Sequence, residues 1–133
     1  MFAREEYAKA HPDLVAKVLA VYLHAISWIH AHPEAAESAF LQFNREAGND
    51  LTPDDARTEV TTHPAFVLEQ QLKLFDRSRG SSTVVDWFNG VIDFMRHKGS
   101  IDQAPDPKLF ATDDFLRLIV KDAKLRRFAD GAD

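Results

Sequence analysis

The sequence contains no cysteine among its 133 residues, which excludes disulfide bonds, thiolate catalysis and cysteine-based zinc sites. Uninterrupted apolar runs fall far short of the about 20 residues that cross a bilayer, and residues 1–6 lack the charged-then-apolar pattern of a secretory signal. Basic side chains are outnumbered, with 16 Lys and Arg against 21 Asp and Glu, so we predict no nucleic-acid partner. We expect a globular chain that carries no signal peptide itself.

Sequence motifs for catalysis and cofactor binding are missing as well. Gly80-Ser81-Ser82 is not a nucleophile elbow, and no Gly-rich loop ends in the Lys that holds phosphates. The adjacent carboxylates Asp54-Asp55 and Asp113-Asp114 lie at the starts of helical patterns, where carboxylates stabilise the helix dipole. His30 and His32 have the wrong spacing for two metal ligands on one helical face. We therefore predict no enzymatic activity, no cofactor and no metal site.

The sequence does contain one long apolar helix, predicted over residues 12–32. Pro12 suits its first turn and Pro33 ends it. Its large apolar side chains cover roughly 220° of the helical wheel, more than a surface helix needs, so we expect this helix to be central. Only the remaining strip is expected to reach water, and it comprises Asp13, Lys17, Ala20, His24, Ser27 and Ala31.

Shorter helical patterns precede and follow the central helix. Gly48 is predicted to end the helix that starts at Pro33, and Thr52 is predicted to cap the next one. No segment shows the period-two alternation of a strand. We predict an all-α fold of five or six helices, in a single helical domain over residues 1–133. A short helical turn is expected at residues 4–10, and the further helices at residues 33–47, 53–60, 65–77, 83–98 and from 112 onward.

Several stretches of the sequence resemble a known family. The first are Arg4-Glu5-Glu6-Tyr7-Ala8, His11-Pro12-Asp13-Leu14-Val15 and Ala25-Ile26-Ser27-Trp28-Ile29-His30-Ala31-His32-Pro33-Glu34-Ala35-Ala36. Leu51-Thr52-Pro53-Asp54 and Phe110-Ala111-Thr112-Asp113-Asp114-Phe115-Leu116 add to the likeness. Together they look like the C-terminal third of periplasmic solute-binding proteins of ABC importers, in the nitrate, sulfonate and taurine group. The strand-rich first lobe of that family lies outside the match.

This resemblance implies both a fold and a role. The fold would be the C-terminal helical part of a type II periplasmic binding protein, which makes the chain a fragment of a larger two-lobed protein. The role would be non-catalytic delivery of a small anionic solute to an ABC permease, in a periplasmic or other extracytoplasmic location. The implied partners are the missing N-terminal α/β lobe, the permease and the solute. Arg4 lies near the point where such a chain leaves a lobe, and it is the one ligand contact that the resemblance suggests.

A free-standing all-α interaction or regulatory module is the alternative that the residues leave open. The exposure of Val21, Leu23 and Trp28 distinguishes the two hypotheses. If all three are covered within one monomer, the chain is built to stand alone. If they lie open, the chain has lost a neighbour, and we then expect the isolated chain to form a homodimer.

Overall fold

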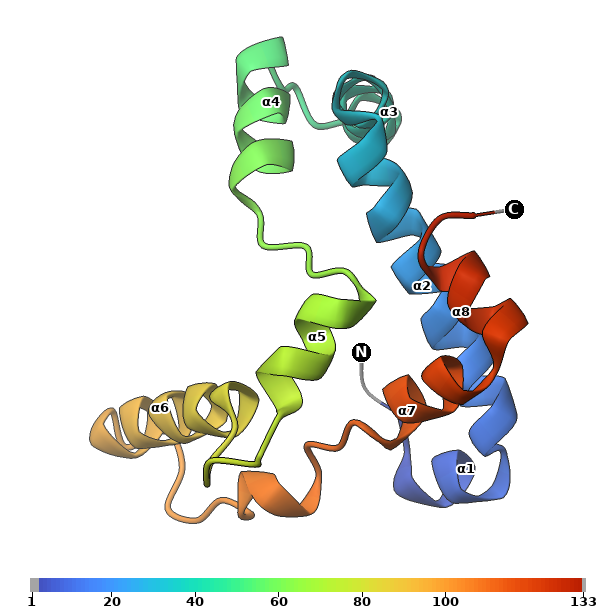
Figure 1. Ribbon diagram of the computed structural model, residues 1–133. Coiled ribbons are helices and arrows are strands. Elements are labelled where there is room, and N and C mark those ends of the chain that lie inside the picture. Colours follow the sequence, from blue (N-terminus) through green and yellow to red (C-terminus); the bar gives the residue numbers. More distant parts are fainter. Residues whose placement is uncertain (1–2, 133) are drawn as a thin grey trace.

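The computed structural model describes residues 3–132, and within that range it is all-α with no strand (Figure 1). The central helix α2 spans Pro12–Ala31, one residue short of its predicted end. The other elements are α1 (Glu5–Ala10), α3 (Pro33–Glu46), α4 (Pro53–Thr62), α5 (Leu68–Phe75), α6 (Thr83–His97), the 3-10 helix η1 (Pro107–Leu109), α7 (Asp114–Lys121) and α8 (Ala123–Ala129).

The described residues form eight α-helices, so the predicted number of five or six is too low. The C-terminal segment accounts for one difference, because it was expected to be one continuous helix. Asp122 breaks it with an extended ψ of 105°, and its carboxylate then caps α8 by accepting hydrogen bonds from the backbone N–H of Lys124 and Leu125. A local side-chain cap therefore lets the chain turn between α7 and α8.

The predicted helix boundaries at Thr52 and Gly48 are confirmed. Thr52 Oγ1 accepts a hydrogen bond from the Asp55 backbone N–H at 3.2 Å, and the Asp55 carboxylate accepts one from the Thr52 N–H at 3.0 Å. This reciprocal capping box satisfies two backbone donors at the start of α4. Gly48 follows α3 with a φ of 81°, a left-handed conformation that glycine adopts without strain.

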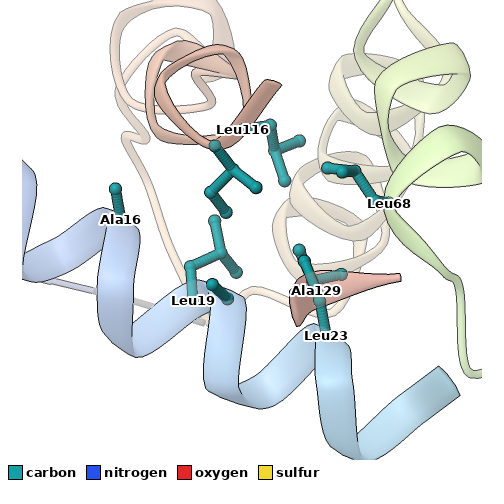
Figure 2. Packing of buried hydrophobic residues seen from close by; sticks show 8 residues of the cluster. Ala16, Leu19, Leu23, Leu68, Leu116 and Ala129 are labelled. Atoms are coloured by element: carbon teal, nitrogen blue, oxygen red, sulfur yellow. The ribbon is translucent and has the colours of Figure 1, made fainter. Parts of the chain in front are cut away.

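The hydrophobic core lies where α7 and α8 pack on one side of α2, and α5 contributes one leucine to it. Figure 2 shows Leu19 and Leu23 of α2 pointing toward Leu116 of α7 and Leu68 of α5. Leu23 is fully buried. Each such leucine contributes about 1.5–3 kcal/mol when it leaves water. Residues from three distant parts of the sequence thus form one small core.

The face of α2 that was predicted to reach water is partly wrong. Ala20 is completely buried, and His24 and Ser27 are half-buried against α8. The His24 ring nitrogen Nδ1 donates to the Phe128 carbonyl at 2.7 Å, and Ser27 Oγ donates to the Ala129 carbonyl at 3.0 Å. The polarity of these residues alone does not show whether a neighbouring helix covers them. Here alanine permits close helix approach, and the polar groups bind carbonyls at the end of α8.

The remaining helices extend away from this core. The helices α3 and α4 pack on each other as a hairpin that continues beyond the end of α2, and α6 lies at the opposite end of the molecule beside α5 (Figure 1). The accessible surface is 9883 Å² for a mass of 15.0 kDa. A compact monomer of that mass exposes about 7,000 Å². The chain therefore leaves far more surface uncovered than a self-contained domain of its size.

Candidate functional site

The most distinctive surface of the molecule is the side of α2 that faces away from the core, which we call the α2 face. Five large apolar side chains lie on it with exposed fractions of 41–58 %, namely Leu14, Val18, Val21, Tyr22 and Trp28. Leu14, Val18, Val21, Ala25 and Trp28 alternate at spacings of four and three residues, the spacing of a coiled-coil seam. The seam runs the length of a helix about 30 Å long.

Aromatic–histidine pairs extend the α2 face at both ends. Tyr7 of α1 lies against His11 with ring centroids 4.7 Å apart, and Trp28 stacks on His32 at 5.1 Å. His32 Nδ1 also donates to the Trp28 carbonyl at 3.0 Å, which fixes the imidazole beside the indole. All four side chains are exposed. The four rings therefore add exposed aromatic surface near both ends of α2.

A second apolar surface, the α6 face, consists of Trp87, Val91 and Phe94. These residues follow one line along α6, and their exposed fractions are 51–61 %. The Trp87 ring stacks loosely on Phe66 at 6.2 Å, and the Lys98 ammonium lies 5.8 Å from the Phe94 ring. Aliphatic and aromatic groups thus remain open at the end of the molecule farthest from the core.

The hollow between α5 and α7 has a volume of about 420 Å³ and is open to solvent. Leu72 and Val120 contribute its apolar wall, and charged side chains form the rim. Lys73 pairs with Glu69 at 2.9 Å, and this hydrogen-bonded cation lowers the pKa of the Glu69 carboxyl. The rim charges are therefore largely neutralised by neighbours within the protein.

Arg117 on the same rim is held by Asp113. Its guanidinium lies 2.7 Å from the Asp113 carboxylate, and this partner raises the pKa of Arg117. Asp76 accepts hydrogen bonds from the backbone N–H and hydroxyl of Ser78, which lower the pKa of the Asp76 carboxyl. These interactions favour the charged forms of Arg117 and Asp76.

The residues that the sequence singled out do not converge on a common site. Arg4 is exposed before α1, where its carbonyl accepts a hydrogen bond from the Ala8 N–H at 2.9 Å, and it does not line the hollow between α5 and α7. His24 contacts α8, whereas His30 and His32 are exposed. In residues 3–132, no group of three His, Asp or Glu side chains is arranged to hold a metal ion.

The helix α2 is long enough and apolar enough to cross a membrane. No other helix in residues 3–132 meets both requirements. The sequence by itself predicts no such helix, because charged and polar residues divide the apolar stretch of α2 into short runs. Core helices of globular proteins meet the same requirements. Since Leu19 and Leu23 of α2 lie in the core, one side of this helix already has a protein neighbour.

Val21, Leu23 and Trp28 have different environments within the monomer. Leu23 is buried, whereas Val21 and Trp28 lie open on the α2 face. Comparisons with protein-family models, curated proteins and solved structures find no match. The resemblance to solute-binding proteins therefore stays a prediction that depends on the quoted sequence stretches.

Proposed function

We propose that this chain is a non-catalytic, helical C-terminal portion of an ABC-importer solute-binding protein for small anions of the nitrate, sulfonate or taurine type. The observation that carries the proposal is the uncovered surface. The chain exposes 9883 Å², about 40 % more than a compact protein of its mass. A segment that normally packs on another lobe exposes such an excess of surface when that lobe is absent.

The α6 face is the surface that we assign to the missing α/β lobe. Helices of α/β proteins pack on a sheet through one apolar stripe, and a helix without its sheet leaves that stripe open. Trp87, Val91 and Phe94 form such a stripe, and α5 and η1 contact α6 without covering it. In the complete protein, the solute would bind between lobes, with Arg4 as a candidate contact and the permease as the downstream partner.

The native mass of the protein in its source cells tests this proposal. An antibody raised against the chain would be applied to exported and cytoplasmic fractions. A species much larger than 15.0 kDa in the exported fraction is the expected result. A 15.0 kDa species confined to the cytoplasm would contradict the proposal, because no lobe would then be present to cover the α6 face.

A free-standing all-α interaction module is the second candidate function, and the closed core favours it. Leu23 and Ile119 are fully buried by helices of this chain alone. The core of α2, α7 and α8 thus forms without help from another lobe. Under this alternative, a pull-down with the wild-type chain recovers one specific protein, and a Trp87→Ala and Phe94→Ala double variant loses it.

A further inference from the structure

The α2 face carries an inference that does not depend on the proposed function. We propose that it binds a second copy of the same chain, with the two α2 helices antiparallel about a two-fold axis near Val21. Leu14, Val18, Val21, Ala25 and Trp28 have the alternating spacing with which one helix inserts side chains between those of another. All five residues are exposed in the monomer, the four large ones with exposed fractions of 41–58 %.

The area of the α2 face is adequate for a stable dimer. Its five large side chains expose roughly 500 Å² of mainly apolar surface, given the 150–250 Å² of a single aromatic side chain. Neighbouring atoms of α1 and α2 would raise the contribution of each copy toward the about 800 Å² of a standard interface. A patch of this size is comparable to the largest apolar patch of a typical monomer, and such patches often mark interaction sites.

The distribution of side-chain size along α2 favours an antiparallel arrangement. With Val21 on the axis, Leu14 of one copy lies opposite Trp28 of the other, so that a smaller residue meets the largest one. Val18 then lies beside the small Ala25. An antiparallel pair also places the opposite ends of the helix dipoles together, which is electrostatically favourable. A parallel pair would instead place the two Trp28 side chains against each other.

The α6 face is a weaker candidate for self-association. Its stripe has only Trp87, Val91 and Phe94, and Gly90 leaves an empty position beside it, with no heavy atom within 4 Å of where a side chain would start. The helix α6 lies at the end of the molecule, away from α2 (Figure 1). The two faces therefore provide a matched pair for experiment, because Val21 and Val91 are 58 % and 55 % exposed.

Sedimentation velocity of the wild-type chain and of charge variants tests the location of the interface. The wild type is expected to sediment with twice the 15.0 kDa monomer mass. Val21→Glu and Val21→Lys are both expected to give monomers, since either places two like charges together at the axis. Val91→Glu should remain dimeric. Far-UV circular dichroism checks that each variant keeps its helices.

Disulfide trapping tests the orientation, which is possible because the chain has no cysteine of its own. Val21→Cys is expected to cross-link to itself under mild oxidation. A mixture of Leu14→Cys and Trp28→Cys chains should give a mixed dimer, and Leu14→Cys alone should not. Self-linking of Leu14→Cys would contradict the antiparallel arrangement, because the two Leu14 positions meet only when the helices are parallel.

Three further results would overturn the proposal. A wild-type monomer at about 100 µM protein, well above the Kd of a standard interface, would exclude the dimer. Dissociation by Val91→Glu but not by Val21→Glu would place self-association on the α6 face. A wild-type monomer that co-sediments with phosphatidylcholine–phosphatidylglycerol vesicles, and that Val21→Glu releases, would identify a lipid surface as the occupant of the α2 face.

Discussion

His24 on α2 lies flat against Phe128 on α8, with ring centroids 4.3 Å apart and planes inclined by only 5°. Its Nδ1 also reaches the Phe128 carbonyl oxygen at 2.7 Å. Because a carbonyl oxygen only accepts hydrogen bonds, Nδ1 carries the proton in this contact. One side chain thus attaches the C-terminal helix to the central helix by stacking and by hydrogen bonding.

Replacement of this side chain should weaken the fold. His24→Ala removes the stack and one of the hydrogen bonds that the Phe128 carbonyl accepts, while the bond from the Gly131 N–H at 3.0 Å remains. We therefore expect the free energy of unfolding to fall by about 1–3 kcal/mol. Urea denaturation followed by circular dichroism measures the change. His30→Ala is the control, because His30 is exposed on the same helix and should alter stability by less than about 0.5 kcal/mol. Equal effects of the two variants would contradict the contact.

The close approach of α2 and α8 should be sensitive to side-chain volume at Ala20. Ala20 is fully buried, so Ala20→Leu forces the helices apart and should cost about 1–3 kcal/mol of unfolding free energy. Ala31→Leu places the same side chain at an exposed position of α2 and should be nearly neutral. Thermal unfolding of both variants gives the comparison. If Ala20→Leu were neutral, Ala20 would face water, as the helical wheel suggested.

Replacement of two glycines by alanine should change the free energy of unfolding in opposite directions. Gly131 has a φ of 90°, and a Cβ placed there would lie 3.2 Å from the Ser27 Cβ. Gly131→Ala is therefore expected to cost about 1–2 kcal/mol of unfolding free energy. Gly90 lies inside α6 with space for a side chain, so Gly90→Ala should stabilise the protein by about 0.5–1 kcal/mol. Urea unfolding midpoints that shift in the same direction would contradict this expectation.

The capping box of α4 should contribute a pH-dependent part of the stability. Hydrogen bonds from the hydroxyl and backbone N–H of Thr52 lower the pKa of the Asp55 carboxyl in the folded protein. The unfolded chain then binds protons more readily, so the contribution is complete above the unfolded pKa of about 3.9. This contribution to stability is lost as the pH falls through the lower pKa that Asp55 has in the folded protein.

Comparison of the wild type with Asp55→Ala measures this contribution. Their unfolding free energies should differ at pH 7 and converge as the solution is acidified below about pH 3.9. Asp54→Ala is the matched control, since Asp54 makes only an exposed ion pair with Arg57 at 3.6 Å. A difference between wild type and Asp55→Ala that stayed constant down to pH 2 would show that the carboxylate charge has no part in the cap.

Local signals allowed many helix boundaries to be predicted. Thr52, Gly48 and the prolines act within about one helical turn, so their neighbours in sequence are also their neighbours in space. The break at Asp122 was missed, although the same kind of signal was present. Its carboxylate caps α8 in the way that Thr52 caps α4. An apolar pattern on both sides of Asp122 obscured that cap.

The candidate surfaces could be predicted only in part. The wide apolar arc of residues 12–32 indicated a helix with more than one covered side, and within the monomer this prediction is wrong, because the α2 face lies open. Arg4 gained no support from its position, because it lies away from the hollow between α5 and α7 and from the core. Trp87, Val91 and Phe94 have the spacing of a helical stripe, but that spacing does not tell whether the stripe is buried, and the structure leaves it open as the α6 face.

The all-α class and the existence of a long central helix were determined by the sequence itself, because hydrophobic period and caps are local properties. Tertiary structure alone decided which side of that helix is buried. Leu23 and Val21 are equally apolar, yet α7 and α8 cover Leu23 and leave Val21 open. The small side chains of Ala16 and Ala20 admit those helices on one side only, and the identity of such packing partners is not encoded in the helix that they cover.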